Sequence, residues 1–100
     1  MIIYEVHVEI EPRHLDTFEN YMRREHLPAI LATGCFRRIT FERETPTHFR
    51  TRYEADTRDD VDRYLAQHTA EFRADFQERY PDGVRVWRDI WDVLECFARD

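Results

Sequence analysis

The residues best suited to chemistry at the start of the chain are a histidine and two carboxylates at alternate positions. His7 lies between Glu5 and Glu9, and apolar Val6 and Val8 separate them. In a strand, the three polar side chains would share one face, where a carboxylate would favour the charged imidazole. An imidazole so placed in an enclosed site can serve as a general base. The alternative is a solvated or interface strand in which His7 has no catalytic role.

Arginine side chains recur at alternate positions in the middle of the chain. Arg50 and Arg52 share one face of a predicted strand, and Arg38 lies in the strand expected before it. Paired guanidinium groups in a cavity hold a carboxylate or a polar ring oxygen through bidentate hydrogen bonds. The alternative is cross-strand pairing with Glu5 and Glu9, which would make the arginines structural. We predict that Glu5, Arg38, Arg50 and Arg52 bind a ligand.

A further histidine and two tryptophans complete the predicted site. His26 directly precedes Leu27-Pro28, where a predicted helix ends or kinks, so its side chain can point to the mouth of a pocket. The alternative is a histidine that the helix dipole favours at a helix C-terminus. Trp87 and Trp91 share a face of the predicted last strand and could stack a flat ligand or line a dimer seam. We predict His7 and His26 as catalytic residues and both tryptophans as ligand-binding residues.

The sequence predicts no metal centre and no disulfide framework. Alternate side chains on one strand lie about 7 Å apart, which makes the Glu-x-His-x-Glu pattern a poor chelator. Cys35 and Cys96 lack the CxxC spacing of a zinc site, and no secretory signal precedes them. We therefore expect a reduced, inert thiol at Cys35.

The composition indicates one soluble domain spanning residues 1–100. A chain of 100 residues suffices for one packed core but not for two. The net charge of −6, from 21 acidic residues and 15 arginines, disfavours nucleic acid as a partner. The sequence has no targeting segment and no apolar run of membrane-spanning length, so we expect no membrane association and a cytoplasmic location.

The elements that must position these residues follow the order strand, helix, strand, strand, helix, strand. We expect them at residues 2–10, 12–26 with a further turn at 29–32, 35–43, 48–55, 57–80 and 84–94. Two such halves pack as a four-stranded antiparallel sheet in the order 4-1-3-2, with both helices on one face. The predicted fold class is therefore α+β, with the ferredoxin-like βαββαβ arrangement.

The second face of this sheet would be bare. The carboxylates, histidine and arginines of the two central strands make its centre polar, whereas Phe36, Trp87 and Trp91 are expected to make its edges apolar. A face of this kind needs a partner where its apolar residues are bulky. We expect two sheets to pack as a homodimer that encloses a partly polar cavity.

Three stretches resemble a known family: Ile3-Tyr4-Glu5-Val6, residues 24–36, and Tyr80-Pro81-Asp82-Gly83-Val84. Together they are similar to a small family of uncharacterised bacterial proteins in the dimeric alpha-beta barrel superfamily, which includes the antibiotic-biosynthesis monooxygenases. The resemblance implies a dimeric barrel. Members of the superfamily include cofactor-free oxygenases, isomerases, haem-degrading enzymes and proteins without known chemistry. The haem-degrading branch typically has an asparagine on the first strand, whereas Asn20 lies on the predicted first helix, so we expect no cofactor.

Three functions remain open from the sequence. The first is a homodimer that binds a small anionic or aromatic molecule in a cavity over the open sheet face. The second is a cofactor-free monooxygenase or isomerase in which His7 or His26 removes a proton from an activated carbon. The third is a structural or regulatory dimer without a ligand.

Overall fold

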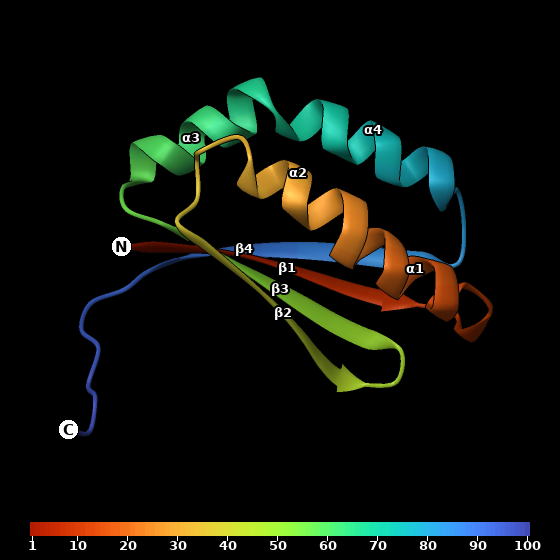
Figure 1. Ribbon diagram of the computed structural model, residues 1–100, viewed down its shortest axis with the longest axis horizontal. Helices are drawn as coiled ribbons and strands as arrows, with labels where there is room; N and C mark the ends of the chain where they lie inside the picture. The colour runs from red at the N-terminus through yellow and green to blue at the C-terminus, as the bar shows by residue number, and fades with distance from the viewer.

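A four-stranded antiparallel sheet with all helices on one face forms the protein, which a computed structural model describes over residues 1–100 (Figure 1). The strand order is β2-β3-β1-β4, which confirms the predicted ferredoxin-like arrangement. The strands are β1 (Ile2–Ile10), β2 (Arg38–Thr45), β3 (His48–Ala55) and β4 (Val84–Asp92).

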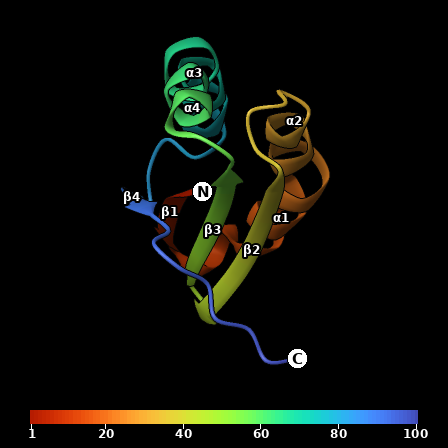
Figure 2. The same ribbon diagram turned by 90° about the vertical axis from the view of Figure 1, so that its left-hand side faces the viewer.

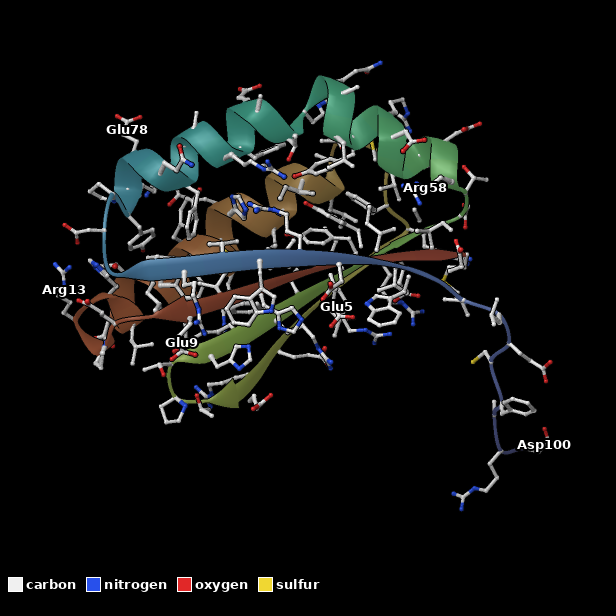
Figure 3. All side chains as sticks on the ribbon, turned by 180° about the vertical axis from the view of Figure 1, so that it is seen from behind. Glu5, Glu9, Arg13, Arg58, Glu78 and Asp100 are labelled. Carbon is white, nitrogen blue, oxygen red and sulfur yellow. The ribbon has the colours of Figure 1, made fainter.

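The central strand β1 separates two chemically different faces. Tyr4, Val8 and Ile10 are buried under the helices, whereas Glu5 and Glu9 lie on the side of the sheet away from the helices (Figure 3). This period-two alternation is what the sequence predicts for a strand with one covered face. We call the uncovered side the open face.

The first helical segment is continuous but changes its winding before the proline. It consists of the 3-10 turn η1 (Pro12–His14), α1 (Leu15–Tyr21), the π-helical turn η2 (Met22–His26) and α2 (Leu27–Leu31). The N–H of Leu27 bonds to the carbonyl of Met22, five residues back. Because Pro28 has no N–H to donate, the wider turn accommodates it without ending the helix. The predicted interruption is therefore a π turn inside the helix.

The second helical segment is divided, where the sequence predicted one helix. Its two parts are α3 (Arg58–Gln67) and α4 (Thr69–Arg79), and His68 between them has φ −124° and ψ −34°. The sheet-facing positions before and after His68 follow one another in steps of four residues. Four residues rotate about 400° around an α-helix, so each step moves this row of side chains about 40° past a full turn. A continuous helix would therefore turn this row away from the sheet. The break at His68 lets α4 keep Phe72 and Phe76 inward.

Phe36, in the loop before β2, does not lie where the sequence predicted. The sequence placed Phe36 on an edge of the open face, but its side chain is only 4% exposed. Its ring lies on the helix side, 5.0 Å from the Tyr64 ring and 5.1 Å from that of Tyr53. Gly34 turns the chain with φ +76°, a conformation that favours glycine, and β2 begins only at Arg38.

The helices form two arms over the sheet, which Figure 2 shows end-on: α1 and α2 lie on one side, and α3 and α4 lie on the other. None of them is long and apolar enough to cross a lipid bilayer. After β4 the chain runs away from the sheet as an extended segment (Figure 1).

Candidate functional site

The cavity predicted over the open face needs the second sheet of a homodimer and stays a prediction. In the single chain, a hollow of about 250 Å³ lies on the open face, and a larger one of about 610 Å³ lies between the helices and the sheet. We call the larger hollow the helix-side cavity. Its apolar wall comes from β1, β4 and α4, namely Val6, Val8, Val86, Phe72 and Phe76.

His26 lines the helix-side cavity and is held by a chain of hydrogen bonds. The hydroxyl of Tyr21 donates to Asp75 Oδ2 at 2.5 Å and lies 3.0 Å from His26 Nδ1. Since that hydroxyl gives its only proton to Asp75, Nδ1 of His26 must donate to it. This arrangement leaves the lone pair on His26 Nε2.

The free Nε2 of His26 is accessible. No protein group bonds to it, and no buried side-chain nitrogen or oxygen in the molecule lacks a partner. Nε2 can therefore accept a hydrogen bond or a proton from a molecule in the helix-side cavity.

Three titratable groups at the helix-side cavity, the imidazole of His26 and the phenols of Tyr21 and Tyr64, stay neutral near pH 7. Burial lowers the pKa of His26 to about 4, opposed by the charge of Asp75. Burial, and then the hydrogen bond to Asp75, raises the pKa of Tyr21. Burial also raises the pKa of Tyr64 to about 12. An uncharged imidazole beside uncharged phenols offers a ligand hydrogen bonds rather than charge.

Two arginines supply the positive charge of the helix-side cavity. Arg73 on α4 and Arg88 on β4 line it, and neither forms an ion pair with a carboxylate of the chain. The charges of both guanidinium groups oppose the rise in the pKa of Tyr64. Neither residue was predicted from the sequence. Arg88 carried a usable signal, because it continues the inward alternation of Val84 and Val86.

On the open face, four of the predicted site residues lie together. His7 Nε2 is 3.1 Å from Glu5 Oε1, and the ring of Trp87 stacks on that of His7 at 5.1 Å and 7°. Arg50 lies 3.7 Å from Glu5 and 2.9 Å from Glu42. These contacts follow the cross-strand register, in which His7 faces Arg50 on β3 and Trp87 on β4. Arg50 is thus paired with carboxylates, but of the partners that the structural alternative named only Glu5 contacts it, because Glu9 accepts a hydrogen bond from Thr47 instead.

The remaining predicted residues do not join that group. Arg38 lies at the sheet edge, 3.8 Å from Glu54. Arg52 faces Glu5 and Thr40 across the strands but forms no ion pair. Trp91 is 56% exposed near the end of β4. His26 lies on the other side of the sheet from His7, so the two predicted catalytic histidines cannot act in one site.

Metal-ligating side chains do not gather in threes. No group of three or more His, Cys, Asp or Glu side chains is arranged to hold a metal ion. Cys35 is buried and Cys96 is exposed, and both are free thiols.

Comparisons with known proteins confirm the family resemblance and the fold. A family model described as "Domain of unknown function (DUF4286)" matches residues 1–94. A search of curated proteins found no match.

Among solved structures, three proteins cover nearly the whole chain. SnoaB, a cofactor-independent oxygenase from Streptomyces nogalater, has a TM-score of 0.78 at 13% identity, covering 98% of this chain and 97% of its own. A dimeric ferredoxin-like protein from an uncultured marine organism has a TM-score of 0.73 at 13% identity, covering 99% and 100%. An antibiotic biosynthesis monooxygenase has a TM-score of 0.69 at 16% identity, covering 95% and 100%. At these identities the similarity shows the fold alone.

Proposed function

The chain belongs to the DUF4286 family, a domain of unknown function, and from this premise we propose that it binds a small aromatic anion in the helix-side cavity. The observation that carries the proposal is one cavity that combines aromatic walls, two unpaired arginines and an accessible imidazole nitrogen. The cavity volume of about 610 Å³ lies within the range of about 300–1,000 Å³ typical of small-molecule sites.

The lining of the helix-side cavity defines the chemistry of this ligand. Eleven of its 17 lining residues are hydrophobic, and the rings of Phe72 and Phe76 favour stacking or edge contact with a flat molecule. Arg73 and Arg88 would hold a carboxylate or phenolate oxygen. His26 Nε2 would accept a hydrogen bond from a ligand hydroxyl. The best match is a hydroxylated aromatic acid.

A fluorescence or calorimetric titration with hydroxynaphthoates tests this proposal. Saturable binding should weaken about tenfold or more in Arg88→Gln, because a hydrogen bond to a charged group is lost. Arg85→Gln is the matched control, since Arg85 is on the same strand but lies over Trp87 on the open face. A naphthalene alcohol of the same shape should bind more weakly than the acid.

Equal affinity of the wild type, Arg88→Gln and Arg85→Gln would contradict the assignment of the site. The absence of any saturable binding of aromatic acids would contradict the function itself and favour a dimer without a ligand.

A second candidate is proton removal by His26 in a cofactor-free oxygenase or isomerase. The chain Asp75, Tyr21, His26 supports it, because it fixes the imidazole tautomer with Nε2 free, as the orienting carboxylate does in catalytic triads. A pKa of about 4 makes the imidazole a weak base, so the substrate must carry an acidic proton. SnoaB, which is similar in fold, is a cofactor-independent oxygenase.

Single-turnover assays with oxygen-sensitive hydroxylated aromatics test this candidate. Turnover should fall at least about tenfold in His26→Asn, which keeps a donor to Tyr21 but removes Nε2. His14→Asn alters a half-buried histidine that does not line the helix-side cavity and should leave the rate unchanged. An unaltered rate in His26→Asn would remove His26 from any mechanism.

The open face supports assembly with a second copy of the chain. Trp91 is 56% exposed there, and exposed tryptophans are typical of protein interfaces. The dimeric ferredoxin-like protein of similar fold supports the same arrangement. Native mass spectrometry should show a dimer at low micromolar concentration, and a monomer would contradict it.

A further inference from the structure

We propose that His7 and His48 form a binding site for a divalent transition-metal ion on the open face. The two histidines come from neighbouring strands, β1 and β3, and are diagonal neighbours in the register, since His7 faces Arg50 and Glu9 faces His48. Their ring nitrogens His7 Nδ1 and His48 Nε2 lie 3.3 Å apart. The site is separate from the helix-side cavity and does not depend on the function proposed there.

A carboxylate orients the ring of His7. His7 Nε2 lies 3.1 Å from Glu5 Oε1, which only accepts hydrogen bonds, so Nε2 carries the proton of the neutral ring and the lone pair is on His7 Nδ1. In the metal-free protein, His7 Nδ1 then accepts the hydrogen bond from His48 Nε2 at 3.3 Å. In its other tautomer, His48 would turn the lone pair of Nε2 toward His7 Nδ1 and its Nδ1 proton toward Glu44 Oε2, 3.7 Å away. A metal ion would replace the hydrogen bond between the two rings.

A metal ion matches the distance between these nitrogens. Zinc bonds to imidazole nitrogen at about 2.0–2.1 Å, and two such bonds at the tetrahedral angle place the nitrogens about 3.3 Å apart. Metal-bound histidines typically donate their other N–H to a carboxylate, as His7 Nε2 can to Glu5 Oε1 at 3.1 Å. Two protein ligands leave the other positions to water or to another molecule.

The surroundings of the histidine pair favour a cation and hold the ligands in place. Four carboxylates, those of Glu5, Glu9, Glu42 and Glu44, lie on the strands around it, against three guanidinium groups, those of Arg50, Arg52 and Arg85. The side chains of His7 and His48 are only 17% and 19% exposed. The Trp87 ring stacks on His7 and lies 5.3 Å from the ring of His48, which restricts both imidazoles. Imidazole ligands select Zn²⁺, Ni²⁺ or Cu²⁺ over Mg²⁺ or Ca²⁺.

Trp87 provides the readout of the test. In a Trp91→Phe background Trp87 is the only tryptophan, and Ni²⁺ or Cu²⁺ bound beside it should quench its fluorescence. We expect saturable quenching with one ion per chain, and none with Mg²⁺. The dissociation constant should rise about tenfold or more in His48→Asn, which removes one ligand, and in Glu5→Gln, which removes the carboxylate that orients His7. His14→Asn should bind as the parent does.

A second measurement does not depend on whether a variant folds. In the wild-type protein, Zn²⁺ should shift the ¹⁵N resonances of His7 Nδ1 and His48 Nε2 more than those of any other histidine nitrogen. Shifts at other histidines alone, quenching that does not saturate, or a folded His48→Asn with unchanged affinity would each overturn the site. Because the aromatic-acid titration reports on the opposite side of the sheet, its failure and the failure of the metal site are distinguishable.

Discussion

At the scale of single residues, the environment of His26 converts an ordinary side chain into a neutral hydrogen-bond acceptor. Its ring packs edge-on against Phe72 at 5.8 Å, and Tyr21 covers its Nδ1. Arg79 lies 4.3 Å above the ring of Tyr21 and pairs with Glu25 at 3.1 Å, which holds the phenol in place. The neutral state is thus a property of the packing around His26.

A first prediction concerns the acid sensitivity of the fold. The pKa of His26 is about 4 in the folded state and near 6.5 in the unfolded chain. Between these values the unfolded state binds more protons, so the free energy of unfolding falls as the pH drops from about 6.5 to 4. The contribution of His26 to this loss is on the order of 3 kcal/mol. Urea unfolding of the wild type and His26→Asn across this range measures it.

The His26→Asn variant should lose less stability than the wild type on acidification. Above about pH 7.5 His26 is neutral in both the folded and the unfolded state. There the free energies of unfolding of the wild type and His26→Asn should differ by a constant amount that does not depend on pH. Equal slopes between pH 6 and 4 would show that burial does not keep this imidazole neutral.

A second prediction concerns Tyr21, which joins α1 to α4. Tyr21→Phe removes the hydroxyl between Asp75 and His26, so the imidazole loses the partner that fixes its tautomer. Hydroxynaphthoate affinity should fall about threefold to tenfold, since one hydrogen bond contributes about 1 kcal/mol, while the fold is kept. Isothermal calorimetry measures the change, and an unchanged affinity would show that the Tyr21 hydroxyl does not position His26.

At the scale of elements, the helices show where local sequence signals suffice and where they do not. Thr57 predicted a helix start, and its hydroxyl indeed accepts the N–H of Asp60 at 3.3 Å. The break at His68 had no proline or glycine to indicate it. It follows from the need to keep an apolar row against the sheet, which only the tertiary structure defines.

The cap at Thr57 gives a third prediction. Thr57→Ala should lower the free energy of unfolding by about 1 kcal/mol, because the N–H of Asp60 loses its acceptor at the start of α3. Chemical denaturation measures the loss. Thr57→Asp retains an acceptor oxygen and should restore most of the stability, whereas equal destabilisation by both substitutions would argue against capping.

Much of the element order could be predicted because it rests on patterns within single segments. The alternation in β1, the hairpin of β2 and β3, and the turn at Pro81 to Gly83 all follow from neighbouring residues. The position of the cavity could not be predicted in this way. It depends on how far α4 lies from β1 and β4, and thus on packing between separate elements, of which β1 and α4 come from opposite halves of the chain.

The candidate site shows the same limit. The predicted pairing of the two central strands correctly placed Glu5, His7 and Arg50 together, because these residues lie on adjacent strands. Arg88 was missed because only the two tryptophans of the last strand were considered as ligand-binding residues. His26 was selected for its place before Pro28, but its partners Tyr21 and Asp75 come from two different arms.

At the scale of the whole molecule, the sheet separates two surfaces that can be changed independently. The helix side contains the aromatic cavity, and the open face contains a charged strand surface with Trp87 and Trp91. A substitution on one face should therefore leave binding on the other unchanged.

The fourth prediction uses this separation to test the dimer. Trp91→Glu should raise the dimer dissociation constant about tenfold or more, because a buried tryptophan at an interface often contributes above 1 kcal/mol. Ile90→Glu is the matched control, since the adjacent side chain faces the helix side. Sedimentation velocity measures both, and a dissociation constant unchanged by Trp91→Glu would place the interface elsewhere.

The π turn at η2 has a consequence for how this chain can change over evolutionary time. A π turn contains one residue more than the α turn that it replaces. Deleting a single codon between Met22 and His26 would restore ordinary winding and rotate everything on one side of it by about 100°. Either Phe18 would leave the core or His26 would leave the cavity. We therefore expect natural selection to remove insertions and deletions in this stretch and to tolerate those in the extended segment after β4.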